Sequence, residues 1–133
     1  MILNELRVGS LVKVFPKPGE TVFLRIKEIH KETIVGEFYK SPGFYLRASF
    51  KDLNAIEFSD EWLPKAGFQE SSAKWELNEY NVNCTLEKQF TRLVIKKGDR
   101  EIVVSGLDIS TVHQFQNIYA AVSGIDLNIA YSG

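Results

Sequence analysis

The stretch that decides the fold is STVHQFQNIYAAVS, residues 110–123, followed by Gly124. Its apolar residues recur at steps of three and four, which places them on one face of an α-helix: Val112, Phe115, Ile118, Tyr119 and Val122. The opposite face is polar and uncharged, with His113, Gln116, Asn117 and Ala120. Nearly everything before this stretch has the pattern of short β-strands, which need an apolar cover on one side. We therefore predict a helix over 110–123 that covers a sheet.

The N-terminal part of the chain, residues 1–58, has five β-rich runs separated by turn residues. We expect strands within 4–15, 21–30, 33–39, 44–50 and 56–58. Gly36 interrupts the third run and predicts a bulge or bend there. Five short strands joined by tight turns favour a small SH3-like barrel.

Residues 59–133 are expected to form a second, compact part of an α+β protein. A short helix should begin at Ser59 as N-cap and end before Gly67, with Pro64 at an awkward fifth helical position. Antiparallel strands are expected at 74–78, 82–88, 91–97 and 100–105, and a last strand at 127–131. Gly98-Asp99 is the clearest two-residue hairpin turn.

Composition excludes several classes of protein. The chain has 133 residues and a formal net charge of −1, so it lacks the positive surplus of proteins that bind nucleic acid through bulk electrostatics. The single cysteine, Cys84, cannot form an internal disulfide, and with only two histidines besides it no zinc site of normal spacing is expected. No apolar run reaches a membrane-spanning length and no secretory signal is recognisable, so we expect a cytoplasmic protein that binds no membrane.

Three motifs carry a resemblance to a known group of proteins: Asn4 to Gly9, the segment from Ile56 through Glu61-Trp62-Leu63 to Phe68, and Val112 to Tyr119 with Gly124. The chain resembles small, uncharacterised proteins of tailed phages, prophages and mobile elements of gut anaerobic bacteria. Pro64 departs from the leucine expected in that pattern. The resemblance implies a phage or mobile-element context inside a bacterial host, and brings no activity or cofactor with it.

Asp108, Ser110 and His113 are the one set that resembles a hydrolase site. A nucleophile needs a base within hydrogen-bond reach and an oxyanion site, and neither is indicated here. Asp108 or Ser110 is the residue type expected at a helix N-cap. We therefore predict a protein that is not an enzyme, with no catalytic residue, metal or cofactor.

Two sets of residues are candidates for ligand binding. His113, Gln116 and Asn117 share a helix face, where they either satisfy buried backbone groups, the interpretation we favour, or bind a polar ligand. Tyr39, Lys40, Tyr45 and Arg47 combine aromatic rings with cations on adjacent strands. Such a mixture can stack bases and hold phosphates, although the same alternation is typical of an ordinary half-exposed strand face.

The functional hypothesis is a non-catalytic accessory protein that binds a host protein or a small ligand. One form of it is a counter-defence role, in which the protein sequesters a nucleotide-type immune signal. The alternative is a structural or nucleic-acid-associated phage protein that uses the barrel strands as a platform. An exposed strand edge would also allow a homo-oligomer.

Overall fold

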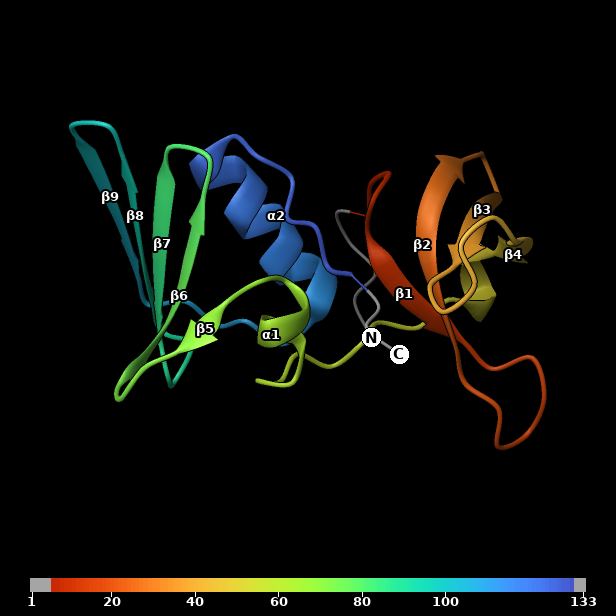
Figure 1. Cartoon of the computed structure of the whole chain (residues 1–133). Helices are drawn as coiled ribbons and strands as arrows, with labels where there is room; N and C mark the ends of the chain where they lie inside the picture. The colour runs from red at the N-terminus through yellow and green to blue at the C-terminus, as the bar shows by residue number, and fades with distance from the viewer. Residues whose placement is uncertain (1–5, 131–133) are drawn as a thin grey trace. The chain divides into compact units, whose positions relative to one another are not determined.

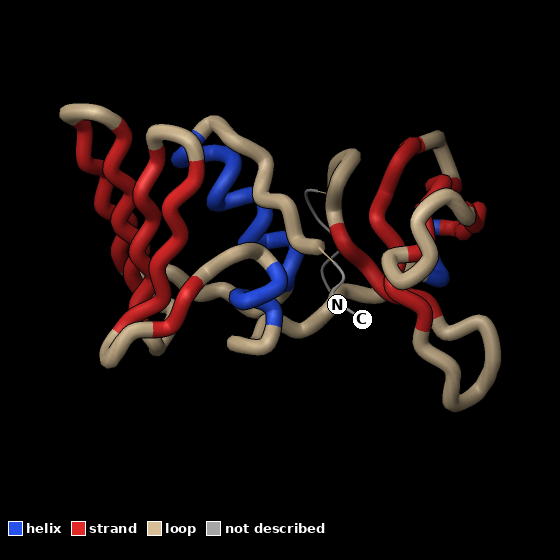
Figure 2. The backbone as a smooth tube through the Cα atoms, viewed as in Figure 1, coloured by secondary structure: helices blue, strands red, loops and turns tan. Residues whose placement is uncertain are grey.

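The structure of this protein is a computed structural model that describes residues 6–130. The chain folds into two compact units. The first comprises residues up to Glu57 together with Thr111–Gln114, and the second comprises Phe58–Ser110 and the chain from Phe115 onward. Strands dominate both units (Figure 2). The predicted α+β class is therefore confirmed.

The first unit contains a four-stranded antiparallel sheet in the order β1-β2-β3-β4 (Figure 1). The strands are β1 Leu11–Val14, β2 Val22–Ile29, β3 Thr33–Phe38 and β4 Tyr45–Ser49, and the short 3-10 helix η1 Phe50–Asp52 follows β4. These strands lie inside the first four predicted runs. Connections of seven, three and six residues join them in chain order. A bulge in β2 lies between Ile26 and Glu28, opposite β3.

The core of this unit lies on the inner face of the sheet. Alternation sends Leu24 and Ile26 inward while Arg25 faces outward. The core cluster consists of Val12, Val14, Leu24, Ile26, Ile34 and Leu53. Gly36 is buried among them, and a Cβ there would lie 2.8 Å from Cβ of Leu24. The glycine at this position therefore permits close approach of β3 to β2.

No closed barrel is found among the described residues, so the sequence prediction holds only as far as the antiparallel sheet. Beyond η1, Asn54 pairs with Lys13 of β1 through two backbone hydrogen bonds of 2.8 and 2.9 Å. The predicted closing strand at 56–58 is wrong, because Glu57 forms only an isolated bridge with Thr111. Asn4 and Glu5, the start of the first predicted run, lie outside the described residues.

The second unit contains a five-stranded antiparallel sheet in the order β5-β6-β7-β8-β9. Its strands are β5 Gln69–Glu70, β6 Lys74–Glu79, β7 Val82–Glu87, β8 Arg92–Lys97 and β9 Arg100–Ser105. The four long strands confirm the predicted meander, and Gly98-Asp99 forms the predicted two-residue turn between Lys97 and Arg100. The prediction of a last strand at 127–131 is wrong for residues 127–130, which form no strand. Tyr131 lies outside the described residues.

Helix α2, Val112–Ser123, runs along one face of this sheet (Figure 1). Phe115 and Tyr119 are 1% and 0% exposed, and Lys97 of β8 donates to the Ser123 carbonyl at 3.4 Å, so the helix covers the apolar face of the sheet as predicted. Phe115 also packs against the rings of Phe58 and Phe68, at centroid distances of 4.8 and 5.8 Å.

The start of α2 is fixed by a capping box at Thr111. The Thr111 hydroxyl accepts from the Gln114 backbone N–H at 3.3 Å, and the Gln114 side-chain oxygen accepts from the Thr111 N–H at 3.1 Å. The helix therefore begins at Val112 rather than at 110, and Gly124, with φ of +77°, follows its end as predicted.

The short helix α1, Trp62–Lys65, begins later than predicted. Ser59 is not its N-cap, because Glu61 takes that position and no side chain caps the helix. Pro64 is consequently the third helical residue rather than the fifth. At the third position a backbone N–H has no acceptor within the helix, so the proline is compatible with it.

No helix in the part of the chain that the structure describes is long and apolar enough to cross a membrane.

Candidate functional site

The outward face of β3 and β4 carries an exposed tyrosine next to an exposed arginine. Tyr45 and Arg47 are two residues apart on β4, so both side chains leave the same face of the sheet, while Leu46 between them faces inward. Tyr45 is 57% exposed. We call the set Lys27, Thr33, Glu37, Tyr45 and Arg47 the β3–β4 face.

Cross-strand neighbours hold the cations of this face in place. Arg47 donates to the Thr33 hydroxyl at 3.0 Å, and it forms no ion pair with any described carboxylate. Lys27 Nζ lies 3.5 Å from Glu37. The Gly43 N–H, which donates to Glu37 at 3.0 Å, and Lys27 together hold the pKa of the Glu37 carboxyl below its usual range. Glu37 is thus ionised and partnered at neutral pH, whereas the remaining guanidinium donors of Arg47 face solvent.

Tyr39 and Lys40, the other two predicted residues of this region, follow β3 and differ in exposure. Tyr39 is 6% exposed, and the guanidinium of Arg25 lies 5.8 Å from its ring centroid. Its ring therefore offers no open face on which a base could stack. Lys40 is exposed, with Nζ 6.0 Å from the ring centroid of Phe23. Alternation along β4 thus places Tyr45 and Arg47 on one face, whereas Tyr39 lies in the interior.

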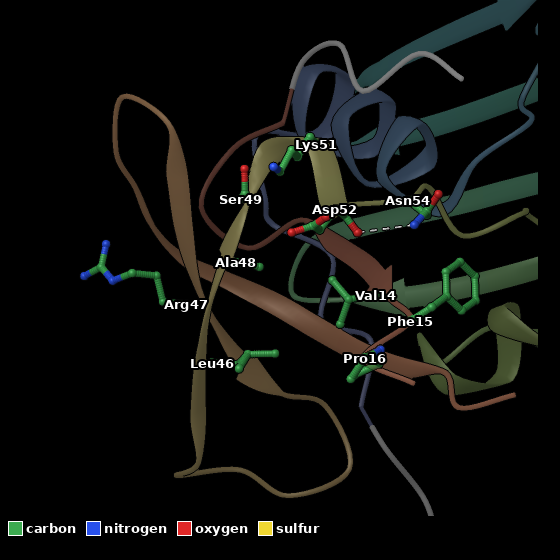
Figure 3. Close-up of a pocket in the computed structure, with 10 residues that line it drawn as sticks. All are labelled: Val14, Phe15, Pro16, Leu46, Arg47, Ala48, Ser49, Lys51, Asp52 and Asn54. Carbon is green, nitrogen blue, oxygen red and sulfur yellow. Dashed lines mark hydrogen bonds between the residues drawn. The ribbon is translucent and has the colours of Figure 1, made fainter. Parts of the chain in front are cut away.

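A groove of about 500 Å³ lies beside the same strand. Leu46 and Ala48 of β4 and Val14 of β1 supply its apolar wall, while Lys51 and Asp52 of η1 supply charges at its rim. Figure 3 shows Leu46 directed into the groove and Arg47 directed away from it on the other side of β4. The residues that line the groove are Val14, Phe15, Pro16, Leu46, Arg47, Ala48, Ser49, Lys51, Asp52 and Asn54.

The sequence analysis did not single out this groove. Phe15, directly after β1, is 53% exposed. A large apolar side chain directly before Pro16 is the one signal in the sequence that indicates a surface feature here. The remaining wall depends on the approach of η1 to β1 through the Lys13–Asn54 pair. Such a pairing joins residues about forty positions apart, so local patterns do not reveal it.

The helix residues predicted as candidates are largely withdrawn from solvent. His113 and Gln116 are 1% and 4% exposed, and Asn117 is half-buried. Buried polar groups of this kind are normally satisfied within the protein. Their burial therefore favours the interpretation in which they have an internal structural role.

Asp108 and Ser110 do not have the capping role that we expected of them. Thr111 caps α2, Asp108 is exposed, and the Ser110 carbonyl accepts a hydrogen bond from the Phe58 N–H at 3.0 Å. His113 belongs to the first turn of α2 and is buried.

The thiol of Cys84 is not part of the β3–β4 face or of the groove. Cys84 is buried in β7, and burial raises the pKa of its thiol to about 12, so the thiol stays protonated and unreactive at neutral pH. Within residues 6–130 no group of three or more His, Cys, Asp or Glu side chains is arranged to hold a metal ion.

We compared the chain with models of protein families, with curated proteins and with solved structures, and no match was found in any of the three.

Proposed function

We propose that this chain is a non-catalytic binding protein of a phage or mobile element, and that the β3–β4 face binds a nucleotide-type ligand. The observation that carries the proposal is the pair Tyr45 and Arg47, side by side on one face of β4 and both exposed. An exposed ring accepts a base by stacking, and an arginine with unused donors pairs with phosphate oxygens. The pair lies on the edge strand of the four-stranded antiparallel sheet.

Sequestration is the form of binding that the site supports best. The face has an aromatic platform, two cations and one carboxylate that is already partnered by Lys27 and Gly43. Its five residues include no nucleophile next to a base, so a bound nucleotide would be held rather than converted. In a host cell such binding would lower the free concentration of a nucleotide immune signal.

Isothermal titration with a panel of mono- and dinucleotides tests the proposal. We expect Tyr45→Ala to weaken binding by about tenfold or more, because stacking of one base on an aromatic ring contributes about 1–3 kcal/mol. Arg47→Ala should weaken binding of phosphorylated ligands by a similar factor and leave free nucleosides unaffected. Tyr80→Asn is the matched control, since Tyr80 is 87% exposed in the turn between β6 and β7.

Native mass spectrometry of the purified protein, run intact and after denaturation, gives an independent readout. A nucleotide-sized compound released from the wild type and absent from the Tyr45→Ala variant supports the proposal. Unchanged affinity in both the Tyr45 and Arg47 variants would remove the β3–β4 face as the site.

A second function, capture of an extended segment of a host protein, is favoured by the groove beside β4. An open groove with an apolar wall and the exposed ring of Phe15 fits side chains of a peptide better than an enclosed metabolite. Lys51→Ala and Phe15→Ala separate this function from the first, because both residues line the groove and neither lies on the β3–β4 face.

The nucleic-acid alternative makes a different prediction about salt. Single-stranded oligonucleotides bound along the same strands should lose affinity steeply as salt rises, because binding releases counterions from several phosphates. Affinity that changes little with salt, or no oligonucleotide binding, would count against it.

A further inference from the structure

Strand β9 is a free edge of the five-stranded sheet. The order β5-β6-β7-β8-β9 places it at one end, with β8 as its only partner among the described strands. Five of its six residues are exposed, and Ile102 and Val103 are 42% and 43% exposed on opposite faces. The opposite edge, β5, has only two residues. Sheets commonly protect their edges by such shortness, by proline or by charge, and β9 has none of these over Ile102–Ser105.

The turn between β8 and β9 determines which backbone groups of β9 point outward. Gly98 and Asp99 form a two-residue turn, so Lys97 and Arg100 are a hydrogen-bonded pair. Alternation then directs the N–H and C=O groups of Arg100, Ile102 and Val104 toward β8. The N–H and C=O groups of Glu101, Val103 and Ser105 point away from the sheet.

We propose that β9 pairs with β9 of a second copy of this chain, antiparallel and centred on Val103. In that register Val103 lies opposite the partner's Val103, and Glu101 lies opposite the partner's Ser105. The outward groups of the two strands would form about six backbone hydrogen bonds. A two-fold axis perpendicular to the sheet relates the two strands, so the contact closes on itself and yields a dimer rather than a fibre.

Side-chain complementarity selects a second copy in this register. Ile102 lies opposite the partner's Val104, which pairs β-branched side chains, and Glu101 lies opposite a serine hydroxyl rather than a carboxylate. A register centred on Glu101 places two carboxylates opposite each other. A register centred on Ile102 places Arg100 and Glu101 opposite valines. Centring on Val103 aligns apolar with apolar residues from Ile102 to Val104 and keeps the two carboxylates of Glu101 apart.

The dimer is expected to be weak. One pair of six-residue strands buries less than the roughly 1,200–2,000 Å² of a stable interface. We therefore expect a monomer–dimer equilibrium with a dissociation constant in the micromolar range. Analytical ultracentrifugation of the full chain over a range of concentrations measures it.

Val103→Pro is the first test variant. The Val103 N–H points away from β8, so proline there removes a hydrogen bond of the dimer and none within the monomer. We expect the dissociation constant to rise at least tenfold with little change in melting temperature. A wild type that stays monomeric up to about 1 mM, a concentration that corresponds to about 4 kcal/mol of binding, would overturn the proposal. So would a dimer that Val103→Pro leaves intact.

Cysteine cross-linking tests the same contact without proline. Val103→Cys places two thiols on residues about 5.5 Å apart between Cα atoms, and mild oxidation should link the two copies. Val94→Cys is the matched control, because Val94 pairs with Val103 on the neighbouring strand β8 and would lie about 14 Å from its counterpart. Native Cys84 is buried and does not interfere. Equal cross-linking of both variants, or none of Val103→Cys, would contradict the register.

A charge exchange tests the register most directly. Ser105→Glu places a second carboxylate opposite Glu101 of the partner, twice per dimer, and should weaken dimerisation about threefold to tenfold. Adding Glu101→Lys in the same chain restores dimerisation, because lysine then faces the new glutamate. Thermal melting of each variant controls for the monomer, since Glu101 and Ser105 pair with Lys96 and Arg92 of β8. A double variant that dimerises no better than Ser105→Glu alone would rule out centring on Val103.

Discussion

The four-stranded and five-stranded sheets of this protein use the same antiparallel pairing, yet they bury their apolar faces differently. The core of the first sheet comes from its own strands and Leu53, with Gly36 permitting close contact between β2 and β3. The second sheet is covered on one face by helix α2, whose Phe115 and Tyr119 are fully buried. A sheet of short strands thus buries its apolar face either with residues of its own strands and the following loop or under a covering helix. The four-stranded sheet carries the groove beside its edge strand β4 and the exposed pair Tyr45 and Arg47.

The largest expected effects come from truncating the two cores. Phe115→Ala should destabilise the second unit by about 3–5 kcal/mol, and Leu24→Ala the first unit by about 2–5 kcal/mol. Both tryptophans, Trp62 and Trp75, belong to the second unit, so tryptophan fluorescence reports on that unit alone. We expect Phe115→Ala to lower the fluorescence midpoint in urea, and Leu24→Ala to act mainly on the transition measured by circular dichroism. Equal shifts of both signals in both variants would show that the two cores unfold together.

Gly36→Ala tests whether close approach of β3 to β2 stabilises the four-stranded sheet. The added Cβ would lie 2.8 Å from Cβ of Leu24, so the backbone must shift, and we expect a loss of about 1–3 kcal/mol. Thermal denaturation measures it. Gly19→Ala is a useful control, because Gly19 has a φ of +81° but no atom within 4 Å of a new Cβ, so its effect reports backbone strain alone. A neutral Gly36→Ala would mean that the sheet does not depend on this contact.

Thr111→Ala should cost about 1 kcal/mol, because it removes the side chain that caps α2. The matched variant Ser110→Ala should be nearly neutral, since Ser110 contributes its carbonyl and is exposed. Chemical denaturation of both variants compares the two positions. A larger loss of stability for Ser110→Ala than for Thr111→Ala would indicate that Ser110 caps α2, as the sequence analysis expected.

Tyr80→Gly should stabilise the second unit slightly. Tyr80 has a φ of +54° and is 87% exposed, so it has an unfavourable backbone conformation and little packing. Glycine adopts this conformation without strain, although it loses more entropy on folding, and the net gain should be about 0.5 kcal/mol. A higher melting temperature of Tyr80→Gly would confirm that the positive φ of Tyr80 destabilises the unit. A lower one would indicate that the tyrosine ring contributes a contact.

Glu37→Gln is expected to have the smallest effect, confined to acidic pH. The folded-state pKa of Glu37 is lowered, so its ionised form stabilises the first unit above the unfolded pKa of about 4.3. This contribution is lost as pH falls through the lower folded-state pKa. Melting curves from about pH 3 to pH 6 should therefore show a flatter acid dependence for the variant. Identical curves would show that the Gly43 and Lys27 contacts do not persist in solution.

Local patterns predicted most of the secondary structure correctly. The three- and four-residue spacing from Val112 to Val122, closed by Gly124, was sufficient for the helix, and Gly98-Asp99 for the turn between β8 and β9. Tyr45 and Arg47 were placed on one strand face by alternation alone. In each case the signal lies within a few residues of the feature that it predicts.

Features that depend on residues far apart in the sequence could be established only from the tertiary structure. Tyr39 and Tyr45 are both aromatic residues close to a cation in the sequence, yet Tyr39 is buried and Tyr45 is exposed. Alternation does not show which other parts of the chain cover a side chain. The expected strand at 56–58 failed because Glu57 meets only Thr111, and the groove exists because Asn54 reaches Lys13. Periodicity determines which face of an element is apolar. Which elements then meet depends on long-range packing, whose energy is spread over many weak contacts that no short stretch of sequence contains.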